Sequence, residues 1–419
     1  MLNNVVGPYK FAAVFVAILA YFPFVGFVPN MDLQPLFYVS ALLFLSLFFL
    51  KLKVDLYFIV LLSMSLFSIT LQFVFWEENA DFKYFVTYLM TLFAIFFFYV
   101  CLKDSGHVFL SSSVILTSFF VYTSVGAVQL FYPDFLASAV TRSVDATFSY
   151  AETGRGVRSL TGEPSSLGKM FSLLNALYVL HLVWHKKVVK PSKLLVISFS
   201  FLLMSTLISR SAYAVIVHFF LIMILWFLIS RKSFFVFSVI GSVILFSAFA
   251  AVLSFLDELR DIRIANIIWL LINEPQAILS QGAMRRVLNV PITFNNLAHF
   301  GWAGAGNSQE VFFASLWTPL GRLDYLGHSR NIGGFVEFAL RFGIFSVPAF
   351  ILYFWLLIRS LNVRSSFSGT DIRIGWYFGA AILLLSFQDS SPALPLALLL
   401  IVGAARVNND ILNKSFQRI

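Results

Sequence analysis

The sequence is poor in charge and has almost no cysteine. Only 12% of its 419 residues are charged, and Cys101 is the single cysteine. One thiol excludes a disulfide framework and a cysteine-based metal site. A soluble domain carries about 25% charged residues, so this composition excludes an ordinary soluble protein. The sequence also has no tandem repeat, no His/Asp/Glu cluster with metal-ligand spacing and no Ser-His-Asp arrangement, and we expect neither a metal nor a cofactor.

The chain is rich in long apolar runs. Hydrophobic residues make up 59% of it, including 51 phenylalanines. Runs of about 18 or more apolar residues recur along the chain, which is typical of membrane-spanning helices. Backbone groups in lipid must be paired within the segment, so each run is expected to be a helix. The first run is too long for a secretory signal and no small-residue cleavage site follows it, so we count it as a span.

The fold class that follows is an all-α polytopic membrane protein. We expect a single transmembrane domain over residues 1–419 with about twelve spans. The predicted spans are 11–28, 36–50, 56–75, 84–102, 108–131, 167–184, 194–208, 212–229, 234–255, 332–358, 374–387 and 393–405.

Lys and Arg set the orientation of these spans. An even number of spans puts both termini on the same side. The N-terminus, every second loop and the C-terminal tail hold more than half of the 29 basic residues, but only Asp55, Asp104, Asp371 and Asp410 among the acidic ones. Cytoplasmic loops are enriched in Lys and Arg, so we expect this side to be the cytoplasm. Basic cytoplasmic loops account for the net charge of +9, so this charge does not indicate a nucleic-acid partner.

Two loops on the opposite, outer side are long. They cover residues 132–166 and 256–331, and the second contains an amphipathic stretch, 262–272, with Trp269. Long connections in compact proteins are usually functional or disordered. The aromatic and leucine content of the second loop favours short helices lying on the membrane surface. We therefore expect the functional site on this face.

The stretch 154–168 is a polar island at the end of the first long loop. It carries Arg155, Arg158 and Glu163 and runs directly into an apolar helix. Pro164 suits the first position of that helix, which places Glu163 at the N-cap. The arginines suit a phosphate or diphosphate, and Glu163 would orient an arginine or accept a proton. The alternative is an ordinary capped helix with a surface ion pair.

Further arginines lie at the same boundary. Arg210 sits in the turn Ser209-Arg210-Ser211, between two spans with almost no loop between them. These spans barely cross the bilayer at about 1.5 Å rise per residue, so Arg210 is expected at or just below the outer surface. A charge at that depth is often functional, although an arginine that snorkels to the headgroups fits the same pattern. Arg285 and Arg286, in the second long loop, are either a phosphate clamp or a solvated basic patch.

The end of the second long loop supplies a histidine. His328 and Asn331 are three residues apart and share a helix face, and histidine changes its charge near neutral pH. The alternative for His328 is an ordinary hydrogen-bonding role. Glu337 and Arg341 are four apart in the favourable order, and we expect them to form a structural pair. The glycines of 301–306 follow no strand of a βαβ unit, so they indicate a tight turn rather than a nucleotide-binding fold.

Taken in order, these motifs resemble the O-antigen polymerases of the Wzy type, relatives of the O-antigen ligases. The resemblance rests on the spans, on Arg-x-x-x-Gly-Glu-Pro-Ser over 158–165, on the Ser-Arg-Ser turn, and on Gly-x-Gly followed by His-x-x-Asn before a helix with Gly and Glu. The resemblance covers the whole topology, but the motifs that carry it are short. One departure is that Ser329 and Arg330 separate His328 from Asn331, whereas the family often places the histidine directly before the asparagine.

The resemblance implies a fold, a reaction and a location. The fold would be a GT-C-like glycosyltransferase in the bacterial inner membrane, with both termini in the cytoplasm. It would join undecaprenyl-diphosphate-linked oligosaccharides into O-antigen or a related surface polysaccharide, without a metal. A chain-length-regulating co-polymerase of the Wzz type would be a further partner.

The resemblance also assigns residues. Glu163 and His328 are the catalytic candidates, and the sequence does not choose between them as the base. The family's arginines correspond to Arg158, Arg210 and one of Arg285 and Arg286. The full set of candidates for binding the substrate diphosphate is Arg155, Arg158, Arg210, Arg285, Arg286 and Arg330.

Two other functions are kept as alternatives. An O-antigen ligase, which moves the glycan onto lipid A–core, would share the arginines and the fold, but the Glu-Pro-Ser motif in the first long loop favours a polymerase. A lipid-linked glycan transporter would call for charged or broken helices near the bilayer midplane and for internal pseudo-repeats, and the sequence has neither.

The orientation gives the first prediction. A reporter tag after Ile419 and one inserted at Arg231 should both report the cytoplasm, because both positions lie on the basic side of the predicted spans. A tag within 275–300 should report the periplasm. A periplasmic C-terminus would overturn the predicted number of spans.

Overall fold

The computed structural model describes most of the chain in continuous segments. These are residues 6–26, 33–48, 55–75, 82–140, 156–187, 189–230, 341–367, 370–387 and 393–416, with the short pieces 269, 272–273, 303–304, 317–318, 321–322 and 338–339. The main helices are α1 (Val6–Tyr21), α2 (Leu36–Phe48), α3 (Leu56–Phe75), α4 (Phe82–Phe109), α5 (Ser112–Gln129), α7 (Pro164–Trp184), α8 (Pro191–Met204), α9 (Ala212–Ser230), α16 (Val347–Leu361), α17 (Gly375–Ile382) and α18 (Pro395–Phe416).

Shorter elements extend or connect these helices. The 3-10 helices are η2 (Ala137–Ala139) and η4 (Gly343–Ser346), and the π-helical turns are η3 (Ser205–Ser209) and η5 (Leu383–Phe387). Two small antiparallel hairpins complete the described elements, β1 (Trp317–Thr318) with β2 (Gly321–Arg322) and β3 (Ser365–Phe367) with β4 (Thr370–Ile372).

The helices establish an α-helical, multi-pass membrane protein. Six of them are long and apolar enough to cross a membrane, and several shorter apolar helices accompany them. Every predicted span except one falls at least partly on a described helix. The exception, 234–255, lies outside the described residues.

Three predicted spans end at least seven residues from the expected place. One of them was expected to end at 102, but α4 continues to Phe109. The first was expected to reach residue 28, but α1 ends at Tyr21. Pro23 disfavours helical backbone in the residue before it, and this stops the helix. The last was expected to end at 405, but α18 continues to Phe416. The prediction followed the apolar run, whereas the helix continues into polar residues.

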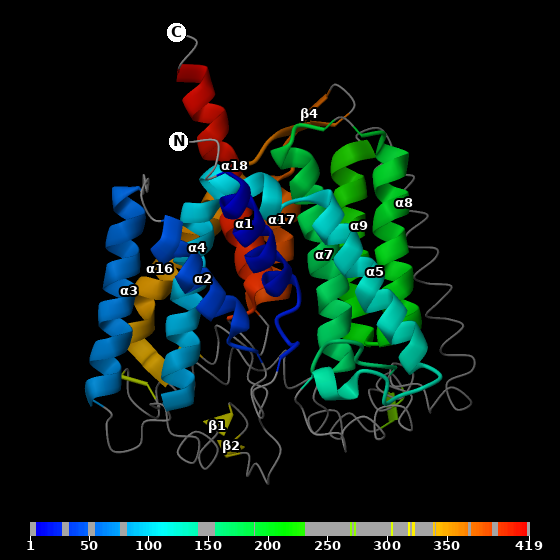
Figure 1. Ribbon diagram of the computed structural model, residues 1–419, viewed down its shortest axis with the longest axis horizontal. Helices are drawn as coiled ribbons and strands as arrows, with labels where there is room; N and C mark the ends of the chain where they lie inside the picture. Colours follow the sequence, from blue (N-terminus) through cyan, green and yellow to red (C-terminus); the bar gives the residue numbers. More distant parts are fainter. Residues whose placement is uncertain are drawn as a thin grey trace.

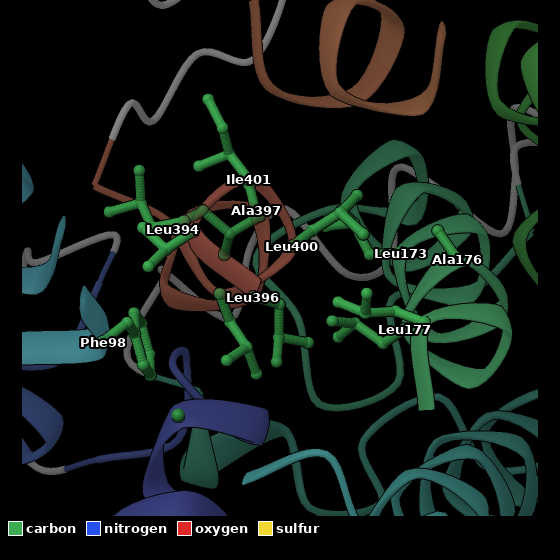
Figure 2. Close-up of a cluster of buried hydrophobic side chains, with 14 of the residues drawn as sticks. Phe98, Leu173, Ala176, Leu177, Leu394, Leu396, Ala397, Leu400 and Ile401 are labelled. Atoms are coloured by element: carbon green, nitrogen blue, oxygen red, sulfur yellow. The ribbon is translucent and has the colours of Figure 1, made fainter. Parts of the chain in front are cut away.

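Helices α7 and α18 form the centre of the bundle. Helix α18 packs against α4, α7, α16 and α17, and in Figure 1 it lies between α3 and α16 on one side and α8 and α9 on the other. Helix α7 is buried along nearly its whole length, as expected of a helix that is hydrophobic all round. Figure 2 shows the apolar contact between them, where side chains of α18 face α7 and α4; the labelled residues are Leu394, Leu396, Ala397, Leu400, Ile401, Leu173, Ala176, Leu177 and Phe98.

Arginines fasten helices together at one end of the bundle. The Arg359 guanidinium lies 3.8 Å above the ring of Trp355 and pairs with Asp55 at 3.2 Å, which joins the end of α16 to the start of α3. Arg406 of α18 lies 4.1 Å from the ring centre of Tyr99 in α4, and its Nε donates to the Tyr99 carbonyl at 3.0 Å. Cation–π contacts of this kind are favourable where the cation is shielded from water.

The bundle has two distinct ends. The start of α1, the end of α18 and the β3–β4 hairpin lie at the upper end in Figure 1. The segment that follows α5, and the start of α7, lie at the lower end, which we call the loop end. The loop end is therefore where the first long loop meets the helices.

Helix α17 supplies a test of the packing. A β carbon on Gly375 would lie 2.1 Å from the Leu361 carbonyl oxygen, a backbone atom that cannot move aside. Overpacking typically costs about 1–3 kcal/mol, so Gly375→Ala should lower the melting temperature of the purified protein. Gly379→Ala is the matched control in the same helix, because the nearest atom there is the flexible end of the Leu361 side chain. Equal melting temperatures for the two variants would contradict this contact.

Candidate functional site

The polar loop that precedes α7 lies directly on the turn between η3 and α9. The Val157 amide donates to the Ile208 carbonyl at 3.0 Å. Gly156 has φ +60°, and a β carbon there would lie 2.4 Å from the Ile208 carbonyl oxygen and 2.6 Å from that of Ser209. Only glycine adopts this backbone freely and permits this approach. We call this contact between residues 156–168 and 205–211 the loop–turn junction.

The first turn of α7 is part of the junction. The Ser209 hydroxyl donates to the Pro164 carbonyl at 2.8 Å. A β carbon on Gly168 would lie 2.5 Å from Cβ of Ala214 in α9 and 2.7 Å from the Ser209 hydroxyl oxygen. Small residues allow transmembrane helices to approach closely. The start of α7 is therefore fixed against both arms of the α8–α9 hairpin.

Arg210 occupies the tip of that hairpin, as predicted. Its backbone is left-handed, with φ +50°, and its amide donates to the Ser205 carbonyl at 3.1 Å, which closes the π-helical turn η3. The side chain is exposed, and its Nε donates to the Leu207 carbonyl at 3.4 Å. Left-handed backbone is uncommon for a residue with a side chain and tends to occur at functional positions.

Glu163 is the N-cap residue of α7 and Pro164 the first helical residue, which confirms both predictions. The Glu163 side chain is half-buried, and its Oε2 accepts a hydrogen bond from the Ser165 hydroxyl at 3.2 Å. The positive end of the helix dipole stabilises a negative charge at this position. The Pro164 carbonyl accepts a hydrogen bond from the Ser209 hydroxyl. The residue after Glu163 is therefore attached to the residue before Arg210, and the loop–turn junction holds both charged residues.

Arg158 is placed differently from the other two charged candidates. Its side chain is only 2% exposed, and its Nη2 donates to the Ala137 carbonyl of η2 at 3.1 Å. The Arg158 carbonyl accepts from the Thr161 hydroxyl at 2.7 Å, and that hydroxyl is 2.9 Å from the Glu163 carbonyl oxygen. Arg158 therefore joins the two ends of the first long loop inside the protein.

Several residues that the sequence did not single out support the loop. The Ser159 hydroxyl donates to the Tyr122 carbonyl at 2.7 Å, and the Gln129 amide group donates to the Ser159 carbonyl at 3.3 Å. Val25, between α1 and α2, forms an isolated β-bridge with Val140. No pattern in the sequence indicates these contacts, because each joins segments that are distant in the chain.

The structure brings together three of the predicted site residues, Arg158, Glu163 and Arg210. The remaining candidates lie outside the described residues; they are Arg155, Arg285, Arg286, His328 and Arg330. Most of the amphipathic stretch 262–272 and Glu337 of the predicted Glu337–Arg341 pair also lie outside them.

One glycine of the stretch 301–306 is described and fits a turn. Gly304 has φ +92°, and a β carbon there would lie 2.5 Å from the Arg341 carbonyl oxygen. This part of the second long loop thus packs closely on the backbone that leads into α16.

The described segments contain no group of three or more His, Cys, Asp or Glu side chains that could hold a metal ion. Comparison with known proteins finds no matching family model, no matching curated protein and no matching solved structure. The loop–turn junction is therefore the feature of the described residues that bears on function.

The junction gives a prediction that does not depend on any activity. Gly156→Ala should detach the loop, because left-handed backbone costs a non-glycine residue about 1–2 kcal/mol and the new methyl group would meet two carbonyl oxygens. A loss of this size corresponds to about 5- to 30-fold more of the open state. Hydrogen–deuterium exchange of the Val157 amide, measured in nanodiscs, should accelerate accordingly. Gly379→Ala is the control, and unchanged exchange in Gly156→Ala would refute the docking.

Proposed function

We propose that this chain is a metal-independent glycosyltransferase that polymerises undecaprenyl-diphosphate-linked oligosaccharide repeat units at the periplasmic face of the bacterial inner membrane. The proposal includes twelve spans, a GT-C-like architecture and cytoplasmic termini. The observation that carries it is the loop–turn junction. It holds a carboxylate, Glu163, and an exposed guanidinium, Arg210, on one rigid support at the loop end of an apolar bundle.

The reaction needs two things from the protein. A hydroxyl of the incoming repeat unit attacks C1 of the sugar that links the growing chain to its lipid. The bond between C1 and the phosphate oxygen breaks, and undecaprenyl diphosphate leaves with the electron pair. The hydroxyl proton must pass to a base, and the negative charge on the leaving group must be stabilised. Because the diphosphate is already activated, no ATP or nucleotide sugar is required on this side of the membrane.

Arg210 is suited to the leaving group. Its guanidinium is exposed at the tip of a hairpin whose backbone is fixed by the Ser205, Ser209 and Ser211 contacts. A planar guanidinium binds phosphate oxygens in pairs. A positive charge positioned before the reaction stabilises the developing negative charge without having to reorganise, and such effects can supply several kcal/mol.

Glu163 and His328 remain the two candidates for the base. The helix start favours the ionised, proton-accepting form of Glu163, and the Ser165 hydroxyl donates to one carboxylate oxygen. Both interactions also make the carboxylate a weaker base, which is the argument for His328. Glu163 then has a second possible role, in which it orients an arginine that binds the donor.

Arg158 contributes to this proposal from inside the protein. Its contact with the Ala137 carbonyl fixes the loop from which Glu163 extends. Its buried position supports a role in holding this loop, and the exposure of Arg210 supports the proposal that Arg210 contacts the substrate diphosphate.

In vitro chain extension tests the proposal. The purified protein, supplied only with lipid-linked repeat units, should produce a ladder of longer lipid-linked glycans. Arg210→Lys keeps the charge but loses the paired donors and should reduce extension strongly.

If Glu163 is the base, Glu163→Gln should reduce the chemical step by about 10²–10⁴-fold while donor binding is nearly unchanged. His328→Ala should do so if the histidine is the base.

A matched control is Arg373→Lys, which changes an exposed arginine next to the β3–β4 hairpin, at the other end of the bundle. It should extend chains like the wild type. Transfer to lipid A–core without chain extension would identify a ligase, and movement of the lipid-linked unit without any new glycosidic bond would identify a transporter. Wild-type extension by both Arg210→Lys and Glu163→Gln would remove the junction from the mechanism.

A further inference from the structure

A column of polar side chains runs from the loop–turn junction into the apolar bundle. Gly168 of α7 packs on Ala214 of α9 and lies close to the Ser205 and Ser209 hydroxyls. Helices α7 and α9 both start at the junction and therefore run in the same direction. One turn deeper on the same faces come Ser172 of α7 and His218 of α9.

The column continues to Asn175. Its Oδ1 accepts a hydrogen bond from the Ser198 hydroxyl of α8 at 3.0 Å. Ser198 and Ser205 are seven residues apart and lie on the same face of α8 and its π-helical extension. Helix α7 contacts α8, η3 and α9, so these side chains lie at successive depths along the seam between the three elements.

Three of the polar groups in this seam have unused hydrogen-bonding atoms. His218, Asn175 and Ser205 are all 0% exposed. Both ring nitrogens of His218, Nδ2 of Asn175 and the Ser205 hydroxyl have no hydrogen-bond partner within the segments that the structure describes. Buried polar atoms are almost always hydrogen-bonded, to protein or to ordered water, and the cost of leaving them unpaired is greatest in an apolar surrounding.

The π-helical turn η3 connects this seam to Arg210. A π-helical turn shifts the backbone hydrogen bond by one residue, as seen in the bond from the Arg210 amide to the Ser205 carbonyl. Such turns are rare and frequently occur at functional sites. Ser205 begins this turn and Arg210 follows it, so whatever holds the Ser205 side chain also restrains Arg210.

We propose that His218, Asn175 and Ser205 line an internal hydrated seam about two helical turns long, with His218 between the other two, and that the water bound at its Ser205 end fixes the π-helical turn that presents Arg210. Water is the ligand because the site is fully buried, the unused atoms include donors and acceptors, and a buried water typically makes about three hydrogen bonds. An imidazole that offers one donor and one acceptor suits the centre of such a site. His218 and Asn175 are thus positioning residues, and the part of this inference that concerns activity rests on the function proposed above.

The water site is tested first on the unmodified full-length protein in lipid nanodiscs. Radiolytic footprinting generates hydroxyl radicals from bound water as well as from bulk water. His218 should be oxidised several-fold faster than Phe171 and Phe201, which are equally buried aromatic residues on the neighbouring helices. His218→Gln should retain the bound water, seen as unchanged labelling of the residues beside it. Labelling of His218 no faster than that of the two phenylalanines would overturn the proposal.

The positioning role is tested with paired variants. His218→Leu keeps the approximate volume but cannot bind water, whereas His218→Gln retains a donor and an acceptor. A small displacement of a substrate-binding group can cost about 10²-fold, so His218→Leu should lower kcat/KM for the lipid-linked donor by about 10- to 100-fold, mainly through KM. His218→Gln should restore most of it. Ser172→Ala is the control, because that hydroxyl already donates to the Gly168 carbonyl at 3.2 Å.

A double substitution separates positioning from general loss of stability. If His218 acts through Arg210, His218→Leu should have little further effect in an Arg210→Ala background. Equal additional losses in both backgrounds would overturn the positioning role. Should the wild-type protein not extend glycans at all, the proposed function fails, but the footprinting result still decides whether the water site exists.

Discussion

The loop end of this protein depends on one close backbone approach, that of Gly156 to the carbonyl groups of Ile208 and Ser209. No β carbon fits there, so the identity of one residue decides whether the first long loop can dock on the α8–α9 hairpin. Once it docks, the Ser209 hydroxyl reaches the Pro164 carbonyl and the start of α7 is fixed. The carboxylate of the helix N-cap and the arginine of the hairpin tip then share one frame. Their relative position is set by backbone contacts and does not require them to pair with each other.

The membrane sets a second constraint, which explains why polar groups concentrate at and below this junction. A polar group inside lipid is costly unless it is satisfied within the protein. Arg158 meets this requirement by turning inward to the Ala137 carbonyl, while Arg210 stays at the exposed tip. His218, Asn175 and Ser205 lie deeper and are fully buried. Apolar packing between α7 and α18 needs none of these residues, which is why we assign them to positioning rather than to stability.

Much of the fold can be predicted from the sequence. A helix that crosses lipid needs a long apolar run, and such runs can be recognised without knowing any tertiary contact. The limits of α3 coincide with the predicted span 56–75, and Glu163 is the N-cap because Pro164 belongs at a first helical position. The π-helical turn and the bridge between Val25 and Val140 were not predicted. Periodicity records which face of a segment is apolar, but it does not record a shifted hydrogen bond or a pairing across a hundred residues. The same limit applies to Arg158, whose sequence context suits a phosphate ligand equally well in a buried and in an exposed position.

The two arginines illustrate how a site can divide its work. A guanidinium that binds a diphosphate must be open to the ligand, and desolvating and ordering its mobile side chain on binding then lowers the affinity. Holding the backbone in the left-handed conformation at Arg210, with the π-helical turn before it, restricts that mobility at the backbone while the side chain stays open. The buried guanidinium of Arg158 fixes a loop at a defined position through the Ala137 carbonyl. If polymerisation is the function, preorganisation of the exposed arginine is the larger effect, since charge stabilisation gains most when the donor does not have to move during the reaction.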